Sequence, residues 1–140
     1  MAQPALSRLL LDALRSVETE TAHLLQERGT VDLTPGQARA ILLVERTGTR
    51  LTDLATTAGV TKQAMMQMVD DLQGMGCLRR TPDPEDARAK IVRLTARGLR
   101  HRAQARKAVQ VVESKVKRRL GPRRYTALRG ALEELTSEEE

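Results

Sequence analysis

The chain contains a single aromatic residue, Tyr125, and has neither Phe nor Trp. Its hydrophobic core must therefore consist of Leu, Val, Ile, Met and Ala, a composition that suits helices. The same shortage excludes the aromatic platforms on which single-stranded nucleic acids usually stack their bases. Duplex DNA, which proteins bind through backbone charge and groove edges, stays open as a partner, and the net charge of +6 favours a polyanion. We therefore expect a mainly α-helical fold.

Apolar residues recur at three- and four-residue steps in most of the chain. At Thr34–Gln37 the order Thr, Pro, Gly, Gln predicts an N-cap with a capping box. Gly29 is typical of the position that follows a helix. The periodicity predicts helices over 4–28, 35 to about 47, 52–58, 61–75, 95–120 and 122–135. Two short alternating runs, 77–80 and 91–94, predict strands joined by a polar, proline-containing loop.

Residues 51–75 have the pattern of a helix-turn-helix, with Gly59 in the turn. The small Ala55 is predicted to allow a close crossing of the two helices. The apolar residues predicted to face inward are Leu54, Ala58, Val60, Met65, Met68, Val69 and Leu72. The outer face of the second helix then carries Lys62, Gln63, Met66, Gln67 and Asp70. In this motif the N-terminal half of the second helix enters the major groove, where Gln pairs with adenine and Lys reaches guanine or phosphate. Thr61, at the N-cap, is predicted to lie where a phosphate meets free backbone N–H groups. A helix pair that binds no DNA is the alternative.

A predicted hairpin follows directly, which makes the expected unit a winged helix. Arg88 and Lys90 lie in its loop and Arg79 lies on its first strand. An arginine at a hairpin tip fits the narrow minor groove of A·T-rich DNA. We expect Asp83 and Asp86 to support the wing by holding the Arg88 side chain. The alternative is an exposed charged hairpin without a partner.

The order of segments and the wing motif resemble the MarR family of bacterial winged-helix regulators. The motif comprises Asp83, Asp86, Arg88, Lys90, Val92, Leu94, Thr95 and Gly98, the last four in a V-x-L-T-x-x-G pattern. The resemblance implies a homodimeric repressor that binds a pseudo-palindromic operator in double-stranded DNA. It places Thr61, Lys62, Gln63 and Gln67 in the major groove and Arg88 in the minor groove. The chain departs from the family at Gln67, often Arg, at Met66, often a small hydroxyl residue, and at Ala87, often a second Arg.

The flanking helices carry more apolar surface than the winged helix needs, which predicts a dimer. We expect residues 1–30 and 96–140 to form a helical dimerisation region and residues 31–95 to form the DNA-binding domain, within one compact unit. The expected interface residues are apolar or aromatic: Leu9, Leu10, Leu14, Val112, Val116, Leu120, Tyr125, Leu128 and Leu132.

The sequence offers no grouping of nucleophile, base or paired carboxylates, so we expect no enzyme activity. His23, His101 and Cys77 lack metal-ligand spacing, and we expect no metal and no cofactor. Cys77 is expected to be a buried thiol. We expect a cytoplasmic, nucleoid-associated protein without a membrane partner. The chain has one cysteine, no signal-type segment and no apolar stretch of about 20 residues. The sequence leaves open whether the protein binds a small-molecule effector and what that effector is. The alternative function is a winged-helix module for protein–protein contact without sequence-specific DNA binding.

Overall fold

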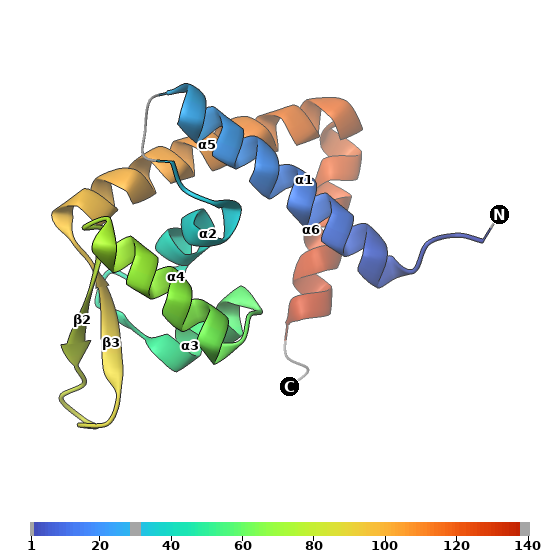
Figure 1. The fold of residues 1–140 in the computed structure, drawn as a ribbon. Coiled ribbons are helices and arrows are strands. Elements are labelled where there is room, and N and C mark those ends of the chain that lie inside the picture. Colours follow the sequence, from blue (N-terminus) through green and yellow to red (C-terminus); the bar gives the residue numbers. More distant parts are fainter. Residues whose placement is uncertain (1, 29–31, 138–140) are drawn as a thin grey trace.

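The computed structural model describes residues 2–28 and 32–137, which form six helices and three strands (Figure 1). The helices are α1 (Leu6–Glu27), α2 (Pro35–Leu43), α3 (Leu51–Ala58), α4 (Lys62–Gly74), α5 (Ala96–Leu120) and α6 (Pro122–Thr136). The strands are β1 (Thr49–Arg50), β2 (Leu78–Pro82) and β3 (Lys90–Leu94). The fold is mainly α, as predicted, and its α3–α4 pair is followed by the expected hairpin.

The sheet is antiparallel, with strand order β1-β3-β2. In the β2–β3 hairpin Leu78 pairs with Leu94 and Pro82 pairs with Lys90. The two-residue strand β1, which the sequence analysis did not predict, adds a third strand by pairing Thr49 with Val92. Two residues are too few to show an alternating pattern, so only the pairing with β3 reveals this strand. It ties the segment after α2 to the base of the wing.

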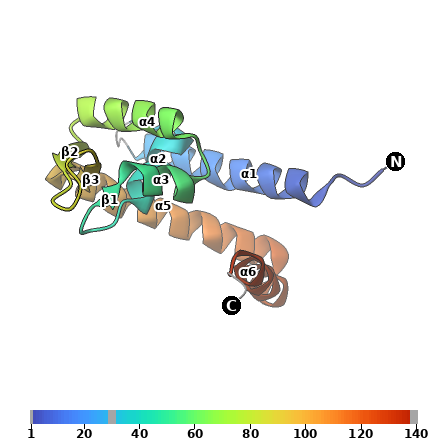
Figure 2. The ribbon, with the colours of Figure 1, turned by 90° about the horizontal axis from the view of Figure 1, so that it is seen from below.

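The main core lies within the winged part, between α2, α3, α4 and the sheet. Its largest fully buried side chains are aliphatic or sulfur-containing, and they include Ile41, Leu54, Met65, Leu72 and Leu78. A smaller cluster joins α1 to α5 through Leu25, Ala105 and Ala108. Alanines at this crossing let the two helices approach closely. The N-terminal half of α1 and all of α6 extend away from the winged part on one side (Figures 1 and 2).

The helix boundaries follow local capping signals. The predicted capping box is present at α2, where the Gln37 backbone N–H donates to the Thr34 hydroxyl and the Thr34 N–H donates to the Gln37 side chain. Our prediction that this helix runs to about residue 47 was wrong, because Val44 is already extended. There the Arg102 side chain from α5 donates a 2.8 Å hydrogen bond to the Val44 carbonyl. The expected helix end at Gly29 lies outside the described residues.

Cys77 is fully buried, as expected, at the start of the hairpin. Burial raises the pKa of its thiol, an effect that the nearby Arg97 charge partly opposes. A protonated thiol is a weak nucleophile, so this position favours packing over reactivity. Within residues 2–28 and 32–137, no helix has the length and apolar character to cross a membrane.

Candidate nucleic-acid interface

Two residues in the turn between α3 and α4 determine where the first helix ends and the second begins. Gly59 ends α3 with a φ of 70°, a left-handed conformation that glycine adopts without a Cβ penalty. Thr61 then begins α4, its hydroxyl accepting a 3.0 Å hydrogen bond from the Ala64 N–H. The buried side chains of α4 are Met65, Val69 and Leu72. The predicted inward face is confirmed for these residues.

The opposite face of α4 is exposed. Lys62, Gln63, Met66 and Gln67 all lie on it, and the Met66 side chain is 43% exposed. Gln67 donates a 3.0 Å hydrogen bond to Asp71 on the same helix. Lys62 and Gln63 make no side-chain hydrogen bond or ion pair with any residue in the described ranges. Their polar groups are therefore free to meet an external partner.

Asp70, on the same helix, has an internal partner instead. Its carboxylate accepts a hydrogen bond from Arg80 on β2, and Arg80 also donates to the Gln73 side chain at 2.8 Å. These contacts tie α4 to the first strand of the wing. Arg80 thus orients the helix relative to the hairpin, a role that the sequence analysis did not predict. Its neighbour Arg79 is exposed on the strand, as an outward-facing residue should be.

The Asp83 and Asp86 carboxylates hold the wing loop through backbone N–H groups and not through the Arg88 side chain. Asp86 accepts a 3.0 Å hydrogen bond from the Arg88 backbone N–H, and Asp83 accepts one of 2.9 Å from the Glu85 N–H. Our expectation that Asp83 and Asp86 hold the Arg88 side chain was wrong. Short Asp side chains bond readily to backbone N–H groups two residues on, and this geometry shapes the turn. The Arg88 side chain is exposed at the end of the hairpin.

Asp83 has an arginine partner that the sequence analysis missed. The Arg50 Nε on β1 lies 2.8 Å from Asp83 Oδ2, and Asp83 is only 5% exposed. This contact is an ion pair rather than an aligned hydrogen bond, because Oδ2 has no hydrogen-bond partner in the described part of the chain. A buried carboxylate needs a nearby cation, so Arg50 anchors the wing base to the start of α3. The residues are 33 positions apart, and only the β1–β3 pairing brings them together.

A hollow of about 250 Å³ lies between α4 and the wing. The five cations among its lining residues are Arg50, Lys62, Arg80, Arg88 and Lys90, and none of the lining residues that the structure describes is acidic. The exposed Met66 side chain contributes apolar surface to the same hollow. The structure therefore brings together helix and wing residues that the sequence analysis assigned to one DNA-binding set. A concave surface lined by one sign of charge attracts a polyanion.

The expected dimer residues fall into three groups. Leu9, Leu10, Leu14 and Leu128 are exposed, whereas Val116, Leu120, Tyr125 and Leu132 are half-buried. Val112 is fully buried within the chain, so our assignment of this side chain to the interface was wrong. It lies one helical turn after Ala108, on the side of α5 that α1 covers.

Comparison with known proteins agrees with this geometry. A family model described as the MarR family matches residues 31–89, which span α2 to the wing loop. Over 95% of this chain and 93% of the other, the structure resembles that of the transcriptional repressor CouR bound to a 23-mer DNA duplex, with 31% identity and a TM-score of 0.79. The chain belongs to the MarR family. Members of this family are transcriptional regulators rather than enzymes, and their DNA-binding unit is a winged helix.

Two further MarR-family structures share the fold at lower identity. MarR from E. coli is 21% identical, with 98% of this chain and 100% of that chain covered and a TM-score of 0.76. CouR from Rhodococcus jostii RHA1 bound to p-coumaroyl-CoA is 20% identical, with 99% and 100% covered and a TM-score of 0.76. Among curated protein sequences, none matches the chain significantly.

Proposed function

We propose that this MarR-family protein is a homodimeric repressor that binds a pseudo-palindromic operator in double-stranded DNA. The observation that carries the proposal is the exposed row of Lys62, Gln63 and Gln67 beside a hollow lined by cations. Residues 31–95 act as the DNA-binding domain, and residues 1–30 and 96–140 act as the dimerisation region. The solved CouR complex, a repressor on duplex DNA, supports the same arrangement here.

In this proposal α4 enters the major groove with its N-terminus leading. Thr61 and the first backbone N–H groups of α4 meet a phosphate, while Gln63 and Gln67 read base edges. Met66 offers an apolar contact to a thymine methyl group. Arg79 and Lys90 contact backbone phosphates, and Arg88 enters the minor groove. Asp83 and Asp86 support the wing by fixing the backbone of its loop.

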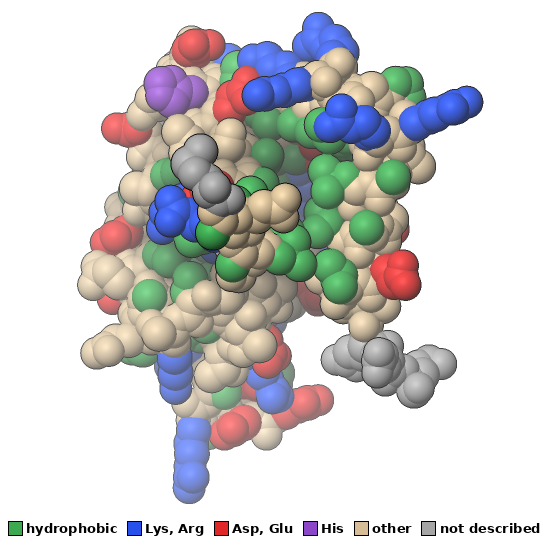
Figure 3. Space-filling view, turned by 90° about the vertical axis from the view of Figure 1, so that its right-hand side faces the viewer, with side chains coloured by type: hydrophobic (Ala, Val, Ile, Leu, Met, Phe, Trp, Pro, Cys, Tyr) green, Lys and Arg blue, Asp and Glu red, His purple; other side chains and the backbone are tan. Residues whose placement is uncertain are grey.

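Dimerisation is proposed from the apolar side chains that the single chain leaves uncovered. On α1, Leu9, Leu10 and Leu14 are 51%, 40% and 44% exposed, and on α6 Leu128 is 43% exposed. Hydrophobic side chains gather on α6 and on the part of the molecule that faces it in Figure 3. Contiguous exposed apolar surface of this kind marks an interaction site, and two-fold pairing of identical patches is the commonest solution. The half-buried Val116, Leu120, Tyr125 and Leu132 complete the proposed interface.

A dimer also explains how a short recognition helix gains specificity. One helix contacts few base pairs, and two copies read half-sites about one helical turn apart. We include release by a small molecule in the proposal, because a CouR structure with this fold holds p-coumaroyl-CoA.

The test is selection of binding sites from a random duplex library, followed by measurement of affinity for the selected duplex. We expect Gln63→Ala to cost roughly 1–3 kcal/mol on that duplex and to relax the preference at one base position. Gln110→Ala, which removes an exposed glutamine from α5, is the matched control and should leave affinity unchanged. Failure to select any common sequence would contradict the proposed operator binding. Wild-type affinity and base preference in Gln63→Ala would remove this residue from the base-reading set.

Arg88→Ala tests the minor-groove contact. We expect the variant to lose most affinity on operators whose flanks are A·T-rich, because a narrow minor groove attracts an arginine most strongly. The salt dependence should also become shallower, by about one counterion per lost contact. Both quantities follow from fluorescence anisotropy titrations on duplexes that differ only in their flanks. Arg123→Ala, on the distant α6, is the control, and equal losses on all flanks would argue against minor-groove insertion.

A further inference from the structure

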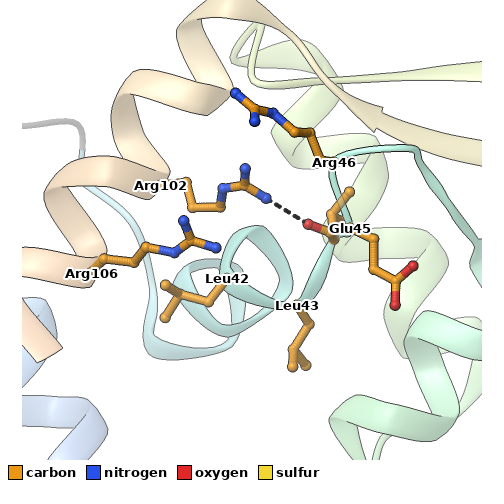
Figure 4. A pocket seen from close by; sticks show the side chains of 7 residues that line it. Leu42, Leu43, Glu45, Arg46, Arg102 and Arg106 are labelled. Carbon is orange, nitrogen blue, oxygen red and sulfur yellow. Dashed lines mark hydrogen bonds between the residues drawn. The ribbon is translucent and has the colours of Figure 1, made fainter.

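A second cation-lined cavity lies away from the recognition helix, between the C-terminal end of α2 and the first half of α5. Its volume is about 420 Å³, and its lining includes Arg46, Arg102 and Arg106 together with Leu42. Figure 4 shows the three guanidinium groups around one space, with Leu42 below Arg106. Arg46 comes from the segment between α2 and β1, and the other two come from successive turns of α5.

The positive charge in this cavity has no counter-ion within the described residues. Arg102 is 7% exposed, and its one side-chain hydrogen bond goes to the Val44 carbonyl, which is uncharged. Arg46 and Arg106 form no side-chain hydrogen bond or ion pair with residues of the described ranges. Glu45 also lines the cavity, but its carboxylate points away from the three arginines (Figure 4) and forms no ion pair with them.

The surroundings of Arg102 disfavour the positive charge on its side chain. Burial lowers the pKa of its guanidinium, and the like charges of Arg106 and Arg46 lower the pKa further. The group nevertheless stays charged at neutral pH, since arginine does not deprotonate in proteins. Three converging cations, one of them buried, are stable together when an anion neutralises them.

We propose that this cavity binds a small oxyanion of two or more negative charges, such as a phosphate monoester or a di- or tricarboxylate. The planar guanidinium groups suit bidentate bonds to carboxylate or phosphate oxygens. A single negative charge would leave most of the cationic charge uncompensated, which is the reason for the multivalent class. The site lies outside the proposed DNA interface, so its binding can be measured without DNA.

Occupancy would also connect two parts of the fold. Arg102 and Arg106 belong to α5, which continues to the proposed dimerisation helices, and Arg46 belongs to the segment that leads to β1. An anion held by all three would therefore fasten this segment to α5. We expect slower amide hydrogen exchange in residues 43–50 when the site is filled.

Isothermal titration calorimetry of the full chain, at constant ionic strength, tests the proposal with citrate and with inorganic phosphate. We expect saturable binding of at least one of them, with acetate about tenfold weaker or worse because it brings a single charge. The two titrations also separate a polycarboxylate site from a phosphate site. Absence of saturable binding by both anions, or equal binding of acetate, would overturn the proposal.

Variants locate the binding. Arg46→Gln combined with Arg106→Gln removes two exposed and unpaired cations, so the fold should be retained while affinity falls about tenfold or more. Arg100→Gln removes an exposed cation from α5 outside the cavity and should bind like wild type. Wild-type affinity in the double variant, or exchange protection that spares residues 43–50, would place the anion elsewhere and refute the assignment. Failure of DNA binding would leave these results unchanged.

Discussion

A chain that carries Leu10→Glu together with Leu14→Glu is expected to be monomeric and to lose operator binding. Both leucines lie on the N-terminal half of α1, 40% and 44% exposed, and a two-fold interface would contain each of them twice. Burial of a leucine side chain contributes about 1.5–3 kcal/mol, whereas a glutamate in the same place must be buried without a partner. The monomer would retain a single recognition helix. Loss of the second half-site should weaken binding to the operator by about a hundredfold or more.

Sedimentation equilibrium measures the oligomeric state, and anisotropy on the selected duplex measures the affinity. The matched control for the oligomeric state is Leu99→Glu, since Leu99 is 41% exposed on α5 but lies outside the proposed interface. That variant should sediment like wild type. The α1 residues concerned are not part of either core cluster, so circular dichroism should report an intact helical fold. A double variant that remains dimeric would exclude this face of α1 from the interface.

Gly98→Ala is expected to destabilise the protein by about 2–3 kcal/mol, because the added methyl group has no space. Gly98 is buried in the first turn of α5, where a Cβ would lie 2.0 Å from the Cys77 carbonyl oxygen and 3.1 Å from Leu94 Cδ2. The same carbonyl accepts a 3.0 Å hydrogen bond from the Thr95 N–H. Any shift that relieves the clash must therefore strain the joint between the hairpin and α5.

Thermal unfolding followed by circular dichroism measures this effect. Gly74→Ala is the control, since a Cβ at Gly74, the last residue of α4, meets no atom within 4 Å. Alanine has the higher helix propensity, so Gly74→Ala should be neutral or slightly stabilising. A Gly98→Ala variant as stable as wild type would mean that the hairpin and α5 separate at little cost.

These features differ in how far the sequence could predict them. The order of the helices, the caps at Thr34 and Thr61, and the inward face of α4 were predicted correctly, because each depends on neighbours within about one helical turn. Gly98 was part of the family motif. The reason that this position needs a glycine, which is its close approach to the Cys77 carbonyl, appears only in the folded chain. The end of α2 at Leu43 was missed, and the Arg102 side chain that donates to the Val44 carbonyl there lies 58 residues away along the chain.

The sequence by itself determined the helical framework, the winged-helix class and the polar face of the recognition helix, since periodicity and capping are local properties. Tertiary structure alone decided that Asp83 pairs with Arg50, that Asp70 holds Arg80 and that Val112 turns inward. It also decided that Arg46 meets Arg102 and Arg106 in one cavity. The physical reason is that charge pairing and burial depend on distance in space, which local patterns do not encode for residues far apart along the chain.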